Sequence, residues 1–278
     1  MGQGTGEVRS VLVLAGLDPS GGAGLLADVR SLGAFGVHAA GVATALTIQD
    51  SARCHGFEPV DSELLQRQLE ALLDDLPVAA IKVGMVGGGH MARVIARTLA
   101  PLVEGGVPLV FDPVLRASVG ADLFDGNPEE ELGPLLAVTT LCTPNRQEAE
   151  ALTGLSLDSL DDARRAARAL RALGPRAVLV KGGHLGAADS PEVTDLLDDG
   201  DGDPALMSSP RLPPPTPHGT GCALSSAIAA QLALGAPLRE AVTAAREHLG
   251  RRIAAAVTVG KGRPVLGEVP AAAPAQPS

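Results

Sequence analysis

The chain has 278 residues, of which 45% are hydrophobic, and its formal net charge is −10. This length allows one large α/β domain with a sizeable core. The acidic balance argues against nucleic acids or anionic membranes as partners. Four Phe with no Tyr or Trp offer no stacking platform for single-stranded nucleic acid. We therefore expect an aliphatic core, a local pocket for any anionic ligand, and no nucleic-acid or membrane partner.

The cysteines and the N-terminus indicate a reducing compartment. Cys54, Cys142 and Cys222 are odd in number and lack C-x-x-C spacing, so neither a disulfide framework nor a zinc site is indicated. The first ten residues, MGQGTGEVRS, contain no apolar segment, and no run approaches the length of a membrane span. We expect a cytoplasmic protein with a flexible leader over residues 1–10.

Short apolar runs alternate with helical patterns along the chain, which is typical of a parallel sheet covered by helices. The predicted strands cover residues 11–16, 39–48, 79–86, 108–114, 137–143 and 177–183. Residues 193–212 predict an antiparallel hairpin that turns at DDGDGD. We expect a single domain over residues 11–262, followed by a Pro/Ala-rich tail over 263–278 that frays.

The first strand leads into GLDPSGGAGLLAD, in which three glycines precede a predicted helix. Asp28 falls on the apolar stripe of that helix, together with Leu25, Val29 and Leu32. A carboxylate there is costly unless it is paired. Its partner could be local backbone N–H groups or a bound ligand. Asp18, before a proline, reads as a turn former.

Gln49 ends the second predicted strand on the same face as Thr47, so its side chain can emerge at the sheet edge. A carboxamide complements an amino donor that lies beside a ring-nitrogen acceptor, as in an aminopyrimidine. The alternative is a solvated loop residue. Asp112 ends a buried strand, and a carboxylate at that rim suits Mg²⁺ carried by phosphates.

TPNRQEAE, residues 143–150, predicts a helix start. Asn145 as N-cap and Glu148 three residues later form a variant of the capping box, which any helix could use. Lys181 closes the strand AVLVKGGH, and by itself it reads as a solvated residue at a strand end.

The segment HGTGCALSSAIAAQLALG predicts a glycine-bracketed turn that runs into a helix beginning near Cys222. Gly219 and Gly221 let the backbone of residues 220–222 approach a ligand, and the unpaired N–H groups favour an anion. No Walker A sequence occurs. The helix dipole is expected to lower the pKa of the Cys222 thiol toward neutrality, which would give a base. The alternative is a small buried cysteine that fits the turn.

HGTGC at the start of a helix resembles the hydroxymethylpyrimidine (phosphate) kinases of the ribokinase superfamily. Further segments resemble this family in the same order, namely AGLDPSGGAGLLAD, TALTIQDS, IKVGMVG, FDPV, TPNRQEAEALTG and VLVKGGH. The resemblance implies a ribokinase-like three-layer α/β/α sandwich with a mostly parallel sheet. It also implies ATP- and Mg²⁺-dependent phosphorylation of 4-amino-5-hydroxymethyl-2-methylpyrimidine and of its monophosphate, for thiamine biosynthesis.

The resemblance also assigns roles to individual residues. Gly219, Thr220 and Gly221 would hold the charge of the transferring phosphoryl group, and Cys222 would be the catalytic base. The remaining residues are implied to bind the pyrimidine (Gly16, Asp28, Gln49, Met85 and Val114), the nucleotide (Asn145, Lys181 and Thr220) and the metal (Asp112 and Glu148). The loop LRASVG, residues 115–120, departs from the family pattern, so no contact is assigned to it.

Two alternatives remain open at this point. A pyridoxal/pyridoxine kinase of the same superfamily would act on a hydroxymethyl-bearing ring of similar size, although Gln49 argues against it. A non-catalytic ligand-binding protein could keep the fold, but the combination of Asp112, Asn145, Glu148, Lys181 and Cys222 argues against that. The expected partners are the pyrimidine and ATP, with a homodimer as an open alternative to a monomer.

Overall fold

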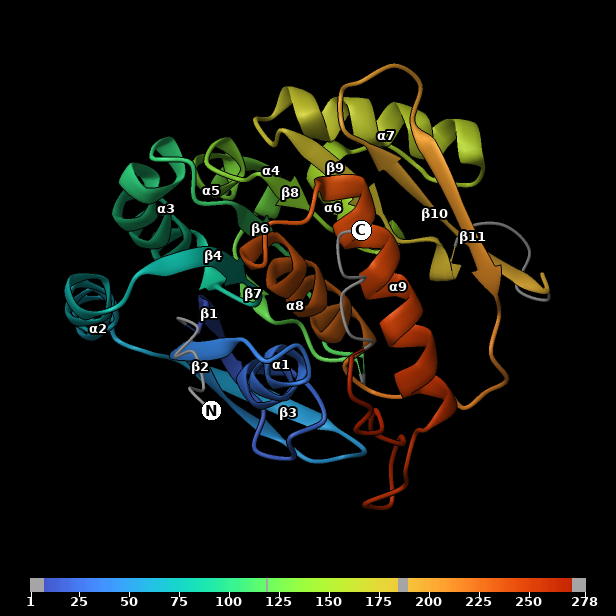
Figure 1. Cartoon of the computed structure of the whole chain (residues 1–278), viewed down its shortest axis with the longest axis horizontal. Helices are drawn as coiled ribbons and strands as arrows, with labels where there is room; N and C mark the ends of the chain where they lie inside the picture. The colour runs from blue at the N-terminus through green and yellow to red at the C-terminus, as the bar shows by residue number, and fades with distance from the viewer. Residues whose placement is uncertain (1–7, 119, 185–189, 272–278) are drawn as a thin grey trace, which may run out of the picture.

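The computed structural model describes residues 8–118, 120–184 and 190–271. Its centre is a nine-stranded sheet with the order β11-β10-β9-β8-β6-β4-β1-β2-β3 (Figure 1). These strands are β1 Ser10–Leu17, β2 His38–Gln49, β3 Cys54–Pro59, β4 Val78–Val83, β6 Leu109–Phe111, β8 Leu141–Cys142, β9 Ala177–Val180, β10 Glu192–Asp198 and β11 Ala205–Pro210. Two further short strands, β5 Gly87–Gly88 and β7 Phe124–Asp125, pair with each other.

The six strands from β9 to β2 are mutually parallel, and antiparallel partners lie at both edges. The hairpin of β10 and β11 pairs with β9, and β3 pairs with β2. The predicted parallel sheet and the predicted hairpin are thus confirmed. The strand β3 was not predicted, because its sequence CHGFEP contains Gly and Pro, which are poor strand formers.

Helices cover both faces of the sheet, which gives three layers (Figure 1). They are α1 Gly24–Gly33, α2 Ser62–Asp75, α3 Gly89–Glu104, α4 Pro128–Glu131, α5 Gly133–Ala137, α6 Arg146–Thr153, α7 Leu160–Ala172, α8 Thr220–Ala233 and α9 Leu238–Ala254, with a 3-10 turn at Gly182–His184. Alternate residues of β1 enter opposite layers: Leu12 and Leu14 face one, Val11 and Val13 the other. The central strands are therefore buried on both faces.

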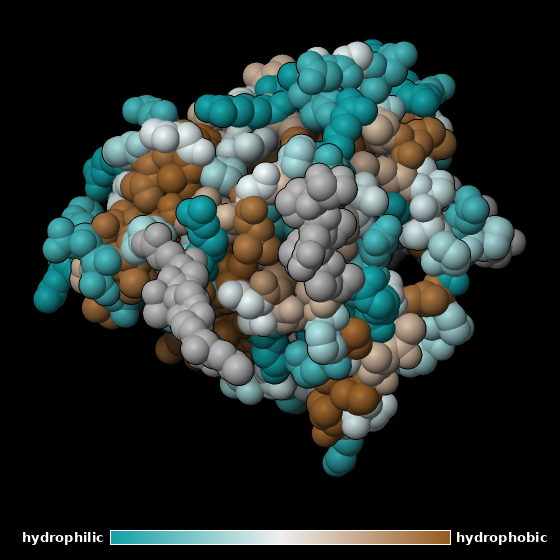
Figure 2. All heavy atoms as spheres, in the orientation of Figure 1, coloured by the Kyte–Doolittle hydropathy of each residue, from teal (hydrophilic) through white to brown (hydrophobic). Residues whose placement is uncertain are grey.

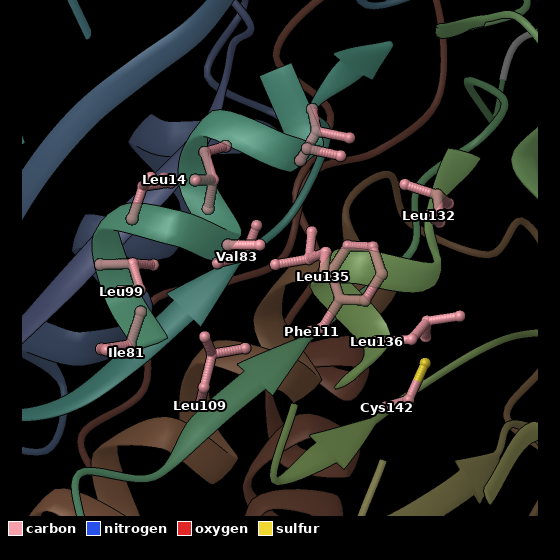
Figure 3. Close-up of a cluster of buried hydrophobic side chains, with 14 of the residues drawn as sticks. Leu14, Ile81, Val83, Leu99, Leu109, Phe111, Leu132, Leu135, Leu136 and Cys142 are labelled. Carbon is pink, nitrogen blue, oxygen red and sulfur yellow. The ribbon is translucent and has the colours of Figure 1, made fainter. Parts of the chain in front are cut away.

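The larger core lies between the sheet and helices α2, α3, α5, α6 and α7. Figure 3 shows part of it, with Leu99 of α3 and Leu135 of α5 facing Val83 and Phe111 of the sheet. The second core joins the opposite face to α1, α8 and α9. The outer surface of α7 is hydrophilic (Figure 2), as expected from a helix that buries only Ala163, Ala166, Ala167 and Leu170. Among the described residues, no helix has the length and apolar character needed to cross a membrane.

The C-terminal segment differs from the free tail expected from residue 263. Val265 pairs with both His218 and Val257, and the side chain of Leu266 is buried. The Gly267 N–H donates to the Arg252 carbonyl oxygen at 3.1 Å. The expectation of fraying is therefore wrong as far as residue 271. Residues 1–7 of the expected leader and 272–278 of the expected tail lie outside the described residues.

His248 of α9 is a buried histidine inside the second layer. Its side chain is 2% exposed and packs edge-on against Phe35, with ring centroids 4.8 Å apart. Neither ring nitrogen has a hydrogen-bond partner in the part of the chain that the structure describes. Burial, assisted by the charge of Arg252, lowers the pKa of His248 from 6.5 to about 4. Folding therefore favours the neutral ring.

This burial predicts an acid-sensitive contribution to stability. Between the two pKa values the unfolded chain binds a proton that the folded protein does not, so the free energy of unfolding should fall as the pH drops from about 7 to about 4. The loss is at most about 3 kcal/mol. His248→Leu should flatten this part of the pH profile in urea titrations, whereas His38→Gln, at an exposed site, should not. An unchanged slope in His248→Leu would contradict the prediction.

Candidate active site

Most of the residues that the sequence singled out gather at one end of the sheet. Five parallel strands, β1, β4, β6, β8 and β9, end there, and α1 and α8 begin there. The helix after β1 and the helix after β4 belong to opposite layers, α1 to one and α3 to the other. Ligands bind at such a change of direction, beyond the carboxyl ends of the strands.

The start of α8 forms the predicted anion cradle. The helix begins at Thr220, and Gly219 before it has a left-handed backbone with φ of 81° and no side-chain cap. A Cβ atom at Gly219 would collide with the Gly22 carbonyl oxygen, so the turn requires glycine. A Cβ atom at Gly221 would lie 3.4 Å from Asp112 Oδ2 and 3.3 Å from Lys181 Nζ. The first N–H groups of α8 therefore begin directly beside a carboxylate and an ammonium group.

Asp112 and Lys181 form an ion pair opposite this helix start. Lys181 Nζ donates to Asp112 Oδ1 at 2.6 Å, and Thr143 Oγ1 donates to the same oxygen at 3.1 Å. Asp112 Oδ2 is buried and has no hydrogen-bond partner among the described residues. Despite burial, the charges of Asp112 and Glu148 raise the pKa of Lys181, so this side chain stays positively charged. The pair presents one free carboxylate oxygen and one cation toward the cradle.

The predicted capping box at the start of α6 is confirmed. Glu148 N donates to Asn145 Oδ1 at 3.0 Å, and Asn145 N donates to Glu148 Oε2 at 2.6 Å. The same Oε2 atom lies 3.6 Å from Lys181 Nζ. Burial, with the charge of Asp112, raises the pKa of Glu148 to about 7, although Lys181 acts in the opposite direction. Glu148 therefore caps the start of α6 and also belongs to the charged cluster with Asp112 and Lys181.

These carboxylates fit a metal ion that arrives with its own ligands. Within the described ranges, no group of three or more His, Cys, Asp or Glu side chains could hold a metal. Two carboxylates, one with an unpartnered buried oxygen, are instead suited to Mg²⁺ that is already bound to phosphates. The donor set therefore fits Mg²⁺ that arrives bound to phosphates.

Two of the side chains expected to line the pyrimidine belong to one small apolar cluster. Met85 is buried with Ala45, and Val114 packs against them. A Cβ atom at Gly16 would lie 2.7 Å from Met85 Sδ, so a side chain at this position would have to displace Met85. Ala117 and Leu123 complete the cluster. Ala117 comes from the loop 115–120, to which the sequence assigned no contact.

Comparison with known proteins now identifies the chain. The family model described as phosphomethylpyrimidine kinase matches residues 18–266. The hydroxymethylpyrimidine/phosphomethylpyrimidine kinase of Streptomyces coelicolor is 39% identical, over 91% of this chain and 91% of its own length. The chain belongs to the phosphomethylpyrimidine kinase family. It is accordingly a phosphotransferase, as the sequence predicted.

Solved structures confirm the ribokinase-like fold of this phosphomethylpyrimidine kinase family member. A phosphomethylpyrimidine kinase from Clostridium difficile 630 superposes with a TM-score of 0.74 and 32% identity, over 87% of this chain and 98% of that chain. The pyridoxal kinase of Bacillus subtilis, solved as an ADP complex, superposes with a TM-score of 0.82 and 28% identity, over 94% and 97% of the two chains.

Asp28 differs from the expectation in its partner. Lys82 Nζ donates to Asp28 Oδ2 at 2.7 Å, and Ser226 Oγ donates to Asp28 Oδ1 at 2.8 Å. The side chains of Asp28 and Lys82 are both 0% exposed. The partner is therefore neither local backbone nor a pyrimidine, and both carboxylate oxygens are occupied. Val29, expected on the buried stripe of α1, is 40% exposed because the helix buries Ala27, Asp28, Ser31 and Leu32 instead.

Cys222 lies at the expected place, in the first turn of α8, but its thiol differs from the expectation. Burial raises the pKa of Cys222 to about 12, although the nearby charge of Lys82 and a hydrogen bond from the Gly24 backbone lower it. Asp28 and Asp112 add to the rise. The predicted low pKa is therefore wrong, since desolvation and two carboxylates outweigh the helix start. In the unliganded kinase, Cys222 is a neutral thiol at neutral pH.

Three residues that contact Gln49, directly or through His218, were not assigned from the sequence. Gln49 Nε2 lies 2.8 Å from His218 Nε2 and 3.2 Å from Asp18 Oδ2, and His218 Nδ1 lies 2.9 Å from Ser118 Oγ. Asp18 had been assigned only to a turn, and it does accept from Ser20 N and Ala23 N, at 2.9 Å each. The HGTGC segment itself contained the signal for His218, since this residue directly precedes the cradle.

The raised pKa of Cys222 predicts slow alkylation. Because the thiolate is the reactive form, the rate of iodoacetamide labelling at Cys222 should be low at pH 7 and should still be rising between pH 8 and pH 9.5. Mass spectrometry of the labelled peptide over this range measures it, with half-buried Cys54 as the reference thiol. A rate that reaches its plateau below pH 8 would show a low-pKa thiol and would restore the original expectation.

Proposed function

We propose that this kinase transfers the γ-phosphoryl group of ATP to 4-amino-5-hydroxymethyl-2-methylpyrimidine, and then to its monophosphate, to give the pyrophosphate used in thiamine biosynthesis. The observation that carries the proposal is the uncapped start of α8, which lies against the Asp112–Lys181 pair. Anion cradle, carboxylate and cation are the parts that phosphoryl transfer needs.

The cradle and Lys181 would stabilise the transferring group. The N–H groups of Thr220, Gly221 and Cys222 are those that α8 leaves unpaired, and the positive end of its dipole adds to them. Charge that develops on the phosphoryl oxygens would meet donors already in place, so little reorganisation is required. Lys181 would contact the phosphates from the opposite side while it remains paired with Asp112.

Asn145, Asp112 and Glu148 would hold the nucleotide and its Mg²⁺. Asn145 Oδ1 already accepts from Glu148 N, so its amino group is the part that can contact a phosphate. The free Asp112 Oδ2 and the Glu148 carboxylate would hold the metal directly or through water. When bound, Mg²⁺ would neutralise phosphate charge. The capping role and the metal role of Glu148 are compatible, because only Oε2 accepts from Asn145 N.

The pyrimidine would lie between Gln49 and the apolar cluster. Met85 can pack against a ring face as a polarizable wall, with Val114 and Gly16 around it. The hydroxymethyl group would then point toward Cys222. Since that thiol is neutral in the free protein, it would accept a hydrogen bond from the hydroxyl. As the new O–P bond forms and the bond from phosphorus to the ADP oxygen breaks, the hydroxyl proton would pass late to an oxygen of the transferred phosphoryl group. The monophosphate brings an ionised oxygen and has no proton to lose at that atom.

Pyridoxal kinase is the second candidate, because the Bacillus subtilis pyridoxal kinase superposes with the higher TM-score of the two structures compared, 0.82 against 0.74. Sequence identity favours the pyrimidine, with 39% to the Streptomyces coelicolor enzyme and 28% to the pyridoxal kinase. A side activity on pyridoxal would fit the shared architecture.

A substrate panel tests the proposed function. The purified protein with ATP and Mg²⁺ should convert the pyrimidine alcohol to the monophosphate and then to the pyrophosphate, with a kcat/KM above that for pyridoxal or pyridoxine and no turnover of ribose. Chromatography of the products at successive times separates the two steps. Turnover of pyridoxal without the pyrimidine would establish the second candidate, and pyrimidine binding without any turnover would establish a binding protein.

The charged cluster predicts a pH-dependent need for metal. Because the raised pKa of Glu148 lies at about 7, its metal-binding carboxylate forms as the pH rises from 6 to 8. The Mg²⁺ concentration for half-maximal activity should fall over this range. Glu148→Gln should need about tenfold more Mg²⁺ and should lose most of the pH dependence.

A matched control separates the metal role from helix capping. Ser159 caps α7, with Asp162 N donating to its side chain. Ser159→Ala should lower the free energy of unfolding by about 1 kcal/mol and leave the Mg²⁺ titration unchanged. If Glu148→Gln behaves in the same way, with lower stability and an unaltered titration, Glu148 is only a cap.

A further inference from the structure

His218 connects the anion cradle to the pyrimidine side of the site. It directly precedes Gly219, and its side chain is buried. A hydrogen bond fixes its backbone: His218 N donates to the Pro264 carbonyl oxygen at 2.8 Å. A Cβ atom at Gly22 would lie only 2.5 Å from His218 Cδ2, so the ring packs directly on the Gly22 backbone. The imidazole is therefore fixed in position.

Both nitrogens of this ring have polar neighbours, and their chemistry determines which atom donates. His218 Nε2 lies 2.8 Å from Gln49 Nε2, and both atoms lie near Asp18 Oδ2, at 3.3 Å and 3.2 Å. Asp18 Oδ1 accepts from Ser20 N and Asp18 Oδ2 accepts from Ala23 N, at 2.9 Å each, so the carboxylate acts as an acceptor in this group.

One assignment forms the most hydrogen bonds among these groups. The Gln49 amino group donates one N–H to Asp18 Oδ2 and the other to His218 Nε2, which acts as an acceptor, so it joins these two acceptors, which lie 3.3 Å apart. His218 Nδ1 then carries the proton and donates it to Ser118 Oγ, 2.9 Å away. In the reversed carboxamide the Gln49 oxygen would lie against the Asp18 carboxylate, and the single N–H of His218 Nε2 would have to serve both oxygens. The Gln49 amide is thus held with its amino group inward.

This arrangement changes what Gln49 can offer to a ligand. The sequence suggested that the amide would present a donor and an acceptor together, but Asp18 and His218 occupy both of its N–H groups. The carbonyl oxygen is the part left for the substrate. A fixed acceptor favours a ring that carries an amino donor and disfavours one that carries an oxygen there.

We propose that His218 is a specificity-determining positioning residue: together with Asp18 it fixes the Gln49 carboxamide as a hydrogen-bond acceptor and so selects the amino-substituted ring. This inference rests on the proposed function, because the selected ring is the aminopyrimidine. It gives His218 no part in the transfer step itself. Through Ser118 the same imidazole also ties the 115–123 segment to the recognition amide.

The test compares two alcohols that differ only at this position, the 4-amino-pyrimidine and its 4-oxo analogue. The wild-type kinase should prefer the amino compound by about 100-fold or more in kcat/KM. His218→Asn is long enough to keep a polar atom near Ser118 but too short to reach Gln49. It should reduce the preference by about tenfold or more, through a raised KM for the amino alcohol, with the KM for ATP changed less than about twofold.

Two further variants make the comparison specific. The longer His218→Gln can place its side-chain oxygen where Nε2 lies, so it should recover most of the preference. Ser118→Ala removes only the exposed partner of the other ring nitrogen, where water can replace the hydroxyl, so it should keep the wild-type preference. Thermal melts of all three variants establish that they are folded. If His218→Asn does not fold, His218→Ala replaces it: a lost preference supports the inference, and an unchanged preference rejects it.

Each outcome bears on one conclusion. Equal loss of kcat on both alcohols in His218→Asn, with the preference unchanged, would show that the residue only shapes the turn before Gly219, and the inference would be wrong. A wild-type kinase that turns over the amino alcohol without any preference would overturn it as well. If the wild-type protein phosphorylates neither alcohol in the presence of ATP and Mg²⁺, the proposed function fails and the inference fails with it.

Discussion

The placement of the anion cradle depends on a charge pair that no solvent reaches. Asp28 of α1 and Lys82 of β4 are both fully buried, and Ser226, one helical turn after Cys222, donates to the free oxygen of the same carboxylate. Three elements are thus joined at one point. Losing one partner of such a pair costs on the order of 3 to 5 kcal/mol, because the other charge remains buried alone. The start of α8 is therefore held firmly against α1 and β4.

The site itself contains two lysines, each of which lies close to buried carboxylates. Lys82 pairs with Asp28 and its charge also acts on the Cys222 thiol, and Lys181 lies within 4 Å of both Asp112 and Glu148. The positive charge of each lysine stabilises the ionised form of a neighbouring buried carboxylate. The start of α8 adds further positive potential. An incoming triphosphate with Mg²⁺ would add both signs of charge together. Because Mg²⁺ would bind the two carboxylates while the phosphates bind the start of α8, the carboxylates need not prevent anion binding by this helix.

The sequence predicted those features that depend on neighbours in the chain. The capping box of Asn145 and Glu148 is a local pattern, and the central strands and the glycine turn before α8 are likewise visible in short windows. Features that join distant segments were missed. Asp28 and Lys82 are 54 residues apart, and Gln49 and His218 are 169 apart, so nothing local indicates that they meet.

Burial was the other limit on sequence reasoning. The dipole of a helix start lowers the pKa of a cysteine there, but desolvation and the charges of Asp28 and Asp112 raise the pKa of Cys222 instead. The edge strand β3 and the packed segment 263–271 contain Gly and Pro, which read as irregular when tertiary contacts are unknown. In each case the local preference was sound, and a contact from elsewhere in the chain outweighed it.

The segment after α9 has a consequence for the order in which the protein can acquire its shape. Val265 pairs with His218, Gly262 and Arg263 donate to Ser51, and Gly267 closes onto Arg252. These residues leave the ribosome after every helix and strand named above. The contacts of this segment with Ser51 and His218 therefore join the last part of the chain to be synthesised to residues near its beginning and to the turn before α8.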